Sequence, residues 1–273
     1  MQNFSIGIIG AGHMGLALAS GLASRMAPDR IAVSDPHADK RQRVHDLGIS
    51  AMADNDSVVA RADLLVLAVK PQAMRDLCAA IAPRVRERRP LVVSVAAGIR
   101  GADIARWLEG GPAIIRAMPN TPALINAGVS VLWANDEATP TQREAAATVL
   151  GAVSQVFWLA DEALMDAATA ISGSGPAYFF LMVEALAAAG AMLGLPPDLS
   201  AALAAGTAAG AGRMVHDHPG EAALLRARVT SPGGTTERAI KSLLGEGFME
   251  MFGRAAQAAC DRSRELGEQL GAA

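Results

Sequence analysis

Ile8-Ile9-Gly10-Ala11-Gly12-His13-Met14-Gly15, near the start of this 273-residue chain, is the stretch of sequence that decides the fold. The apolar run Phe4–Ile9 predicts a buried strand, and the G-x-G-x-x-G turn leads directly into a helical pattern near 14–26. Glycines at this spacing permit a tight turn and let the backbone approach a pyrophosphate, which would face the free N–H groups of the helix. The stretch therefore predicts the first βα turn of a dinucleotide-binding sheet.

Outward from this turn, short apolar runs alternate with helical patterns over the first 160 residues. We expect strands at Ile31–Ser34, Leu64–Val69, Leu91–Val95, Ile114–Arg116, Gly128–Trp133 and Gln155–Leu159. Helical patterns lie near 39–47, 55–61, 71–86 and 140–151. Alternation of this kind predicts a parallel, doubly wound sheet, here extended by partly antiparallel strands. Residues 1–160 are thus expected to form an α/β, Rossmann-like dinucleotide-binding domain.

The strand pattern disappears from Asp161 onward. Helices are expected near 176–193, 198–216, 219–227, 236–244 and 247–270. Pro176 suits the first position of the first of these helices, and Gly194 with Pro196 ends it. We expect an all-α domain over residues 161–273, joined rigidly to the first domain because no low-complexity linker lies near residue 160.

Composition excludes several classes of protein. Hydrophobic residues make up 51% of the chain, which excludes disorder. The longest uncharged runs, 117–135 and 167–183, approach the length of a membrane span. Both contain Gly and Pro turns and lack flanking basic clusters or aromatic belts, so we interpret them as the interior of a soluble protein. The net charge of −3 argues against a nucleic-acid partner.

The two cysteines and the N-terminus favour a cytoplasmic protein. Cys78 and Cys260 show neither the spacing of metal ligands nor a disulfide framework, so we expect no metal. The N-terminal residues have no basic segment before the first strand, and we expect no signal peptide. Reduced cysteines and a missing signal are typical of a reducing compartment.

The end of the second strand bears on the choice of cofactor. Asp35 follows Ser34, and an acid at this point commonly binds a ribose 2′-hydroxyl and favours NAD. Lys40, Arg41 and Arg43 follow immediately and could meet the 2′-phosphate of NADP, or they could be a solvated helix start. The residues leave both cofactors open.

Three further strand ends lie at the edge of the sheet where ligands of doubly wound folds bind. Ala68-Val69-Lys70-Pro71 would place a lysine toward the cofactor or the cleft. Val95–Ile99 brings small residues, Ala97 among them, against which a nicotinamide ring could lie. Arg116-Ala117-Met118-Pro119-Asn120-Thr121-Pro122 forms a rigid loop whose polar tip is either a hydrogen-bonding group or a structural turn.

Two glycine- and hydroxyl-rich segments precede helices in the second domain. Ser172-Gly173-Ser174-Gly175-Pro176-Ala177-Tyr178 is either a helix cap or an anion-binding nest. Thr230–Glu237 repeats the theme, and its backbone N–H groups could hold a carboxylate while a threonine hydroxyl donates to a neighbouring atom. An ordinary capped helix is the alternative at this loop.

No pair of residues suited to nucleophilic catalysis or strong general-base catalysis is evident. Lys241 is the only lysine after residue 70, so the catalytic lysine of hydroxyacid dehydrogenases is missing from 176–193. This lack suits a reaction with an easy proton step. Hydride addition to a protonated imine is one, because its carbon is already electrophilic.

The motifs quoted above resemble those of the pyrroline-5-carboxylate reductase family, in the family's order and over essentially the whole chain. The most specific are the blocks that begin at Arg116, at Ser172 and at Ser231. The resemblance implies a Rossmann domain, an interlocking helical dimerisation domain, and reduction of 1-pyrroline-5-carboxylate to L-proline. NADPH is the usual hydride donor in the family, with NADH possible, and the partners are the substrate and further copies of the chain.

The resemblance also implies roles for individual residues. Those expected to bind the cofactor are Gly10, Ala11, Gly12, His13, Met14, Gly15, Ser34, Asp35, Asn55, Ala68, Val69, Lys70, Pro71, Ala97 and Asn120. Those expected to bind the substrate are Ser174, Ser231, Gly233, Gly234 and Thr235, with Thr236 placed to hydrogen-bond the ring nitrogen as the catalytic residue.

Two departures from the family pattern and two rival functions remain. Asp35 is acidic where NADP-preferring members often have a neutral residue, and His13 stands where Asn is more usual. A hydroxyacid dehydrogenase of the same architecture and a non-catalytic redox sensor are the alternatives. The near-absence of charge in 161–212, where all five charges are acidic, favours a helical surface buried against a second subunit.

Overall fold

A computed structural model describes residues 4–272, and the chain within it forms two compact units. The sheet unit extends to Ser174 and takes in the chain again from Ala258, whereas the helical unit is Gly175–Gln257. An α/β unit and an all-α unit confirm the expected fold class. The expected boundary near residue 160 lies earlier in the chain than this division, because Met165 and Ala170 are buried among the residues that follow the sheet.

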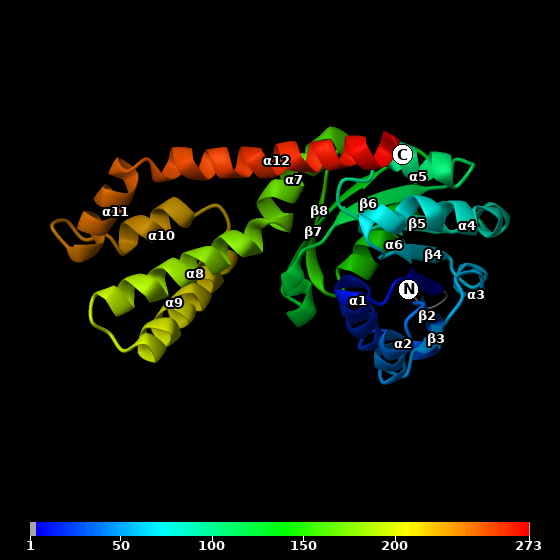
Figure 1. The fold of residues 1–273 in the computed structure, drawn as a ribbon, viewed down its shortest axis with the longest axis horizontal. Helices are drawn as coiled ribbons and strands as arrows, with labels where there is room; N and C mark the ends of the chain where they lie inside the picture. Colours follow the sequence, from blue (N-terminus) through cyan, green and yellow to red (C-terminus); the bar gives the residue numbers. More distant parts are fainter. Residues whose placement is uncertain (1–3, 273) are drawn as a thin grey trace. The chain divides into compact units, whose positions relative to one another are not determined.

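The sheet unit is built on one eight-stranded sheet (Figure 1). Its strands are β1 (Ile6–Ile9), β2 (Ile31–Ser34), β3 (Ser50–Met52), β4 (Leu64–Leu67), β5 (Leu91–Ser94), β6 (Ile114–Met118), β7 (Gly128–Ala134) and β8 (Ser154–Trp158). They lie in the order β3-β2-β1-β4-β5-β6-β7-β8. All neighbouring strands are parallel except β6 and β7, so the partly antiparallel extension is confirmed.

Strand β1 stands where the strand order reverses, which is where such sheets bind ligands. It pairs with β2 and β4 in matching register, so that Ile9 lies beside Ser34 and Leu67. All three strands are buried on both faces, as their continuous apolar runs predict. The carboxyl ends of these strands therefore meet at one edge of the sheet.

Helices cover both faces of the sheet (Figure 1). One face packs against α1 (His13–Ala23), α2 (Ala38–His45) and α6 (Pro140–Leu150). The other packs against α3 (Asp56–Val59), α4 (Met74–Arg88) and α5 (Gly101–Trp107), and Leu270 joins this second core. The sequence pattern did not predict α5 or β3. Helix α5 has only seven residues, and β3 is a three-residue strand without β-branched residues.

Short helical turns complete the sheet unit. They are η1 (Pro28–Arg30), η2 (Pro71–Ala73), η3 (Thr121–Ile125), η4 (Glu162–Leu164), α7 (Met165–Ala168) and the π-turn η5 (Thr169–Gly173). In η5 the backbone N–H of Ser174 donates to the carbonyl of Thr169 at 2.8 Å. This wide turn leads directly into the first helix of the second unit.

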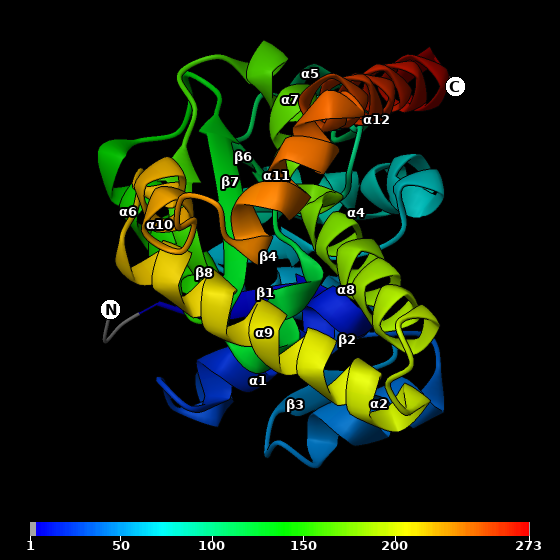
Figure 2. The same cartoon turned by 90° about the vertical axis from the view of Figure 1, so that its left-hand side faces the viewer.

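The helical unit contains α8 (Gly175–Met192), α9 (Pro197–Asp217), α10 (Ala222–Arg228), α11 (Thr235–Gly245) and the start of α12 (Phe248–Ala272). Helices α8 and α9 form a hairpin (Figure 2), closed by a bond from the Ser200 hydroxyl to the Ala187 carbonyl at 2.7 Å. The Tyr178 ring meets Phe252 edge-on at 5.5 Å. No strand occurs in the described residues after β8, as expected.

Large apolar side chains remain exposed in the helical unit. Phe179, Phe180 and Leu181 are each at least 60% exposed, and other exposed side chains are Leu186, Met192, Leu193, Leu199, Leu203, Met214, Leu224, Met249 and Met251. The helical stretch Glu162–Met192 is also long and apolar enough to cross a membrane by length and composition alone. Apolar surface on this scale marks an interaction site.

Candidate active site

The three glycines of the turn between β1 and α1 are required for different reasons. Gly10 has φ +102°, and a Cβ there would lie 2.6 Å from the Ala68 carbonyl oxygen. A Cβ on Gly15 would collide with the carbonyl oxygen of Gly10. At Gly12 φ is −68°, and an added Cβ would meet no atom of the described chain within 4 Å. The packing of the protein itself requires Gly10 and Gly15, whereas no contact within the described chain requires Gly12.

The N-terminus of α1 fits the pyrophosphate of a dinucleotide. Gly12 is the N-cap and contributes no side-chain hydrogen bond to the first turn. The first N–H groups of the helix therefore lack an intrahelical acceptor and face the open space beside Gly12. His13 is exposed at the first helical position, as expected of a loop residue beside phosphates.

Asp35 supports the glycine turn from the end of β2. Its carboxylate is 5% exposed and accepts hydrogen bonds from the Ala11 backbone N–H at 2.9 Å and the His37 backbone N–H at 3.0 Å. The His37 ring lies 2.9 Å from Oδ1, and the Lys40 ammonium lies 3.6 Å from Oδ2. Both carboxylate oxygens are thus engaged within the protein. Burial raises the pKa of Asp35, but these hydrogen bonds outweigh burial and lower the pKa below its ordinary value of 3.8.

Replacing Asp35 by asparagine should destabilise the protein by about 1–3 kcal/mol, because the new amide group leaves one of the two backbone donors without an acceptor. Urea unfolding of both proteins measures the difference. Asp39→Asn is the matched control, since Asp39 is exposed one turn away and its loss should change stability by less than about 0.5 kcal/mol.

The same carboxylate predicts a dependence of stability on pH. A pKa lowered by folding adds stability that is present above pH 3.8 and lost as the pH falls through the lower value of the folded protein. The D35N protein should lack this part of the acid-induced loss. Equal slopes of stability against pH for the two proteins would contradict the role given to Asp35.

Other residues expected at the cofactor lie along the same edge of the sheet. The Ser34 hydroxyl donates to the Asn55 side-chain oxygen at 2.8 Å, which brings these two residues together beside Asp35. Ala68 packs against the glycine turn, and Lys70 is exposed at the start of η2. The structure therefore gathers the expected residues from the ends of β1, β2 and β4 and from the start of α3.

The side chain of Asn120 forms hydrogen bonds within the protein through both its amide nitrogen and its amide oxygen. Its amide nitrogen donates to the Ser172 carbonyl at 3.0 Å, and its amide oxygen accepts from the Val129 backbone N–H at 2.9 Å. The residue is 9% exposed. It thus fastens the loop after β6 to the segment that contains Ser174. Its expected contact with the cofactor stays a prediction, as does that of Ala97.

The loop expected to bind the substrate lies in the helical unit, and a hydrogen bond within the loop orders it. Gly233 has φ +73°, and its backbone N–H donates to the Glu237 carboxylate at 2.9 Å. This hydrogen bond and the ion pair with Lys241 lower the pKa of Glu237. Gly234 is the N-cap of α11, so the N–H groups of Thr235 and Thr236 lie in a first helical turn without intrahelical acceptors. Such a turn can hold a carboxylate.

Thr236 keeps its hydroxyl available. The residue is half-buried, and no residue of the described chain forms a hydrogen bond with its Oγ1. Thr230, by contrast, donates its hydroxyl to the Arg226 carbonyl at 2.6 Å. Ser231, Gly233, Gly234, Thr235 and Thr236 share one loop in the helical unit, while Ser174 ends the first segment of the sheet unit. Their roles toward substrate stay predictions.

Two residues that support these sites, His37 and Glu237, were not singled out from the sequence. His37 and Arg41 stabilise the turn after β2, since the Arg41 guanidinium donates to the carbonyls of Asp35 and Pro36 at 2.9 and 2.8 Å. Glu237 orders the substrate loop. Its place three residues after the N-cap Gly234 is the spacing of a capping box and could have indicated it.

The fold and these two sites define a dinucleotide-dependent oxidoreductase with a separate helical unit. Residues 5–98 match a family described as NADP oxidoreductase coenzyme F420-dependent, and residues 162–266 match a pyrroline-5-carboxylate reductase dimerisation family. No group of three or more potential metal ligands lies in the part of the chain that the structure describes.

Whole-chain comparisons point to one family. The chain is 46% identical to pyrroline-5-carboxylate reductase of Pseudomonas aeruginosa (99% of this chain, 100% of that one) and 39% identical to that of Glycine max (97% of each). A solved reductase from Coxiella burnetii superposes with TM-score 0.92 at 38% identity, covering 96% and 98% of the two chains. That of Plasmodium falciparum, solved with NADP bound, gives 0.85 at 29% identity over 98% and 99%. The chain belongs to the pyrroline-5-carboxylate reductase family.

Proposed function

We propose that this chain reduces 1-pyrroline-5-carboxylate to L-proline with NADPH, the last step of proline biosynthesis. The observation that carries the proposal is that the chain has two sites suited to ligands, one for the cofactor and one for the substrate. One is a glycine turn whose open space at Gly12 nothing in the described chain fills. The other is a helix start with free N–H groups and an unengaged hydroxyl on Thr236. Membership of the reductase family supports the proposal.

The glycine turn and the ends of the neighbouring strands hold the cofactor. The first turn of α1 takes the pyrophosphate on its free N–H groups, and Ser34 and Asn55 lie at the adenosine ribose. When bound, the cofactor supplies a hydride from nicotinamide C4 to the imine carbon. The small residues around Ala97 leave room for the ring at the end of β5.

The preference between NADPH and NADH follows from the hydrogen bonds that the Asp35 carboxylate accepts within the protein. Both of its oxygens already accept hydrogen bonds from Ala11 and His37, so the carboxylate supports the turn and has less capacity left for a ribose hydroxyl. Lys40 and Arg41 flank the same turn and can offset the charge of a 2′-phosphate. We therefore propose that NADPH is preferred and that NADH serves less well.

The substrate loop positions the imine. The N–H groups of the first turn of α11 hold the substrate carboxylate, and the Thr236 hydroxyl hydrogen-bonds the ring nitrogen, which ends the reaction protonated. Hydride adds to the imine carbon, so one hydride and one proton convert the C=N bond to CH–NH. A protonated imine needs no strong acid, and catalysis comes mainly from positioning.

Turnover with each cofactor tests the proposal. Purified protein is incubated with racemic 1-pyrroline-5-carboxylate and either NADPH or NADH, and cofactor oxidation is followed with time. We expect turnover with a higher kcat/KM for NADPH. Turnover of a 2-oxoacid and not of the imine would favour a hydroxyacid dehydrogenase, and cofactor binding without turnover of either substrate would favour a redox sensor.

We propose in addition that the chain is an obligate homodimer or higher homo-oligomer of the cytoplasm. A second copy of the helical unit would cover the exposed Phe179, Phe180 and Leu181, and the match to a dimerisation family over 162–266 supports that partner over a membrane. The helical domain that dimerises would then begin near residue 161, as the sequence predicts.

Light scattering should give a mass of at least twice 28.0 kDa at micromolar concentration, because an isolated monomer would leave a large apolar surface in water. The measurement needs no substrate. A stable particle of 28.0 kDa without detergent would overturn the proposed assembly.

A further inference from the structure

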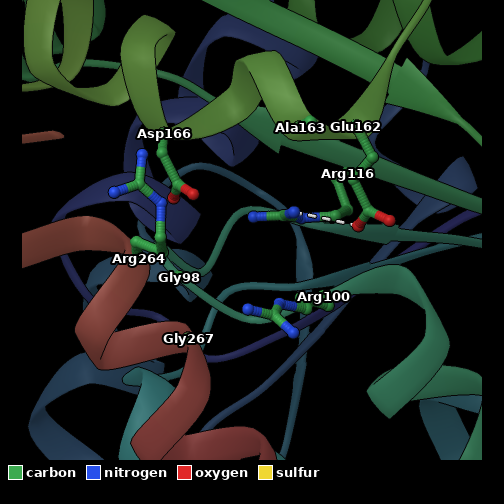
Figure 3. Close-up of a pocket in the computed structure, with 8 residues that line it drawn as sticks. All are labelled: Gly98, Arg100, Arg116, Glu162, Ala163, Asp166, Arg264 and Gly267. Atoms are coloured by element: carbon green, nitrogen blue, oxygen red, sulfur yellow. Dashed lines mark hydrogen bonds and ion pairs between the residues drawn. The ribbon is translucent and has the colours of Figure 1, made fainter. Parts of the chain in front are cut away.

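A cavity of about 310 Å³ in the sheet unit is lined by residues other than those of the glycine turn (Figure 3). Its walls come from the loop after β5, strand β6, the turns η4 and α7, and the end of α12. The lining residues are Gly98, Arg100, Arg116, Glu162, Ala163, Asp166, Arg264 and Gly267. The reaction proposed above gives no role to the charged residues among them, although Gly98 follows Ala97 in the loop after β5.

Three arginines from three different elements line this cavity, as Figure 3 shows. Arg100 precedes α5, Arg116 lies on β6 and Arg264 lies on α12. Two carboxylates, Glu162 and Asp166, line it as well. The lining therefore has one more positive than negative side chain, which favours an anion.

Arg116 is the buried member of this group, at 6% exposure. Its Nη1 donates to Glu162 Oε1 at 2.9 Å, and the same oxygen accepts from the Gly101 backbone N–H at 2.7 Å. Its Nε has no hydrogen-bond partner, and no residue of the described chain bonds Nη2. The Nε–Nη2 edge of an arginine is the one that grips a carboxylate or phosphate with two parallel hydrogen bonds. Buried donors are otherwise almost always paired.

The acids of the cavity do not occupy that edge. Asp166 accepts from the Ser263 hydroxyl at 2.6 Å, and Glu162 is used by Nη1. Arg264 pairs with Asp261 at 2.9 Å, and Arg100 lies 3.7 Å from Glu268, both at half-exposed positions. The two outer arginines can therefore turn toward a ligand at modest cost, while Arg116 stays fixed.

We propose that this cavity binds a small oxyanion, a phosphate group or a carboxylate, with Arg116 as its fixed contact and Arg100 and Arg264 as its mobile ones. The cavity volume admits such an ion. The oxyanion pairs with Nη2 of Arg116, which no residue of the described chain bonds, while Nε beside it is enclosed by protein atoms. The lining residues are not those of the pyrophosphate turn, and occupancy of the site requires no catalytic turnover.

Isothermal titration tests the site with protein saturated in NADP⁺ and L-proline, so that the cofactor's own phosphate sites and the proposed carboxylate site at α11 are filled. Inorganic phosphate is titrated in one arm and acetate in the other, at constant ionic strength set with chloride. We expect saturable binding of at least one of the two ions at one site per chain. Binding only of phosphate identifies a phosphate group as the ligand, and binding only of acetate identifies a carboxylate.

Four variants locate the binding. Arg100→Gln and Arg264→Gln should each weaken it by about tenfold or more, through loss of one charge-assisted hydrogen bond. Arg116→Lys keeps the positive charge beside Glu162 but lacks the Nη2 donor, and it should weaken binding at least as much. Arg84→Gln, which removes an exposed arginine paired with Glu87, should leave the affinity unchanged.

Two results would overturn the proposal. One is the absence of saturable binding for either ion, and the other is unchanged affinity in both Arg100→Gln and Arg264→Gln. These half-exposed positions tolerate glutamine, so the test stands even if Arg116→Lys does not fold. The readout is binding and not turnover, so it fails or succeeds independently of the reductase activity.

Discussion

Replacing Gly12 by alanine is expected to lower the affinity for NADPH about a hundredfold while leaving the thermal stability unchanged. The backbone of Gly12 has φ −68° and ψ −171°, which alanine adopts without strain, and the added methyl meets no atom of the described chain within 4 Å. The methyl would instead occupy space where the backbone approaches the pyrophosphate. Overpacking of that contact costs about 1–3 kcal/mol, and the upper part of this range corresponds to about a hundredfold in affinity.

Gly15→Ala is the matched variant, with the opposite pattern of effects. Its methyl would collide with the Gly10 carbonyl oxygen inside the protein. We expect a loss of about 3 kcal/mol or more in stability, whether or not cofactor is present. Fluorescence titration with NADPH and thermal unfolding are measured on both variants. Equal loss of stability in the two, or unchanged affinity in Gly12→Ala, would contradict a pyrophosphate site at this turn.

Replacing Thr236 by alanine is expected to lower kcat/KM for 1-pyrroline-5-carboxylate by about tenfold to a thousandfold, which corresponds to ~1.4–4 kcal/mol of transition-state stabilisation. The variant loses the hydroxyl that would bond the ring nitrogen. Its fold should not change, because Oγ1 of Thr236 contacts no hydrogen-bond partner in the described chain. Steady-state kinetics with NADPH at saturation measure the effect.

Two companion variants separate chemistry from loop structure. Thr236→Ser retains a hydroxyl and should recover most of the activity. Thr230→Ala removes a hydroxyl that only bonds the Arg226 carbonyl within the protein, so it should affect stability more than kcat. If Thr236→Ala kept the kcat/KM of the unchanged protein, Thr236 would have no part in the mechanism.

The sequence predicts the sheet well, for a physical reason. Four of its strands, β1, β2, β4 and β5, are short apolar runs buried on both faces. The glycine motif directly after β1 identifies it as the strand at which the strand order reverses. Strand β3 was missed because Ser50–Met52 lies at the sheet edge, where little burial is needed and no β-branched residue marks it. Elements that depend on edge pairing leave a weak pattern in the sequence.

Individual site residues were less predictable than the elements that hold them. The ribose contact expected of Asp35 stays a prediction, and the sequence did not show that its carboxylate also accepts hydrogen bonds from Ala11 and His37. The bond to Ala11 joins residues 24 positions apart and depends on how β1 and β2 end side by side. The free edge of Arg116 is likewise invisible in the sequence, since it follows from which single nitrogen Glu162 happens to reach.

The central claim is that a hydride passes from the cofactor to the imine carbon of 1-pyrroline-5-carboxylate on this chain. The most direct measurement supplies NADPH deuterated at nicotinamide C4, on the face that is transferred, and analyses the proline formed by mass spectrometry and NMR. We predict one deuterium per proline, on the ring carbon that was the imine carbon and that bears no carboxylate. Proline without deuterium at that carbon, or no proline with deuterated cofactor of either face, would contradict the account.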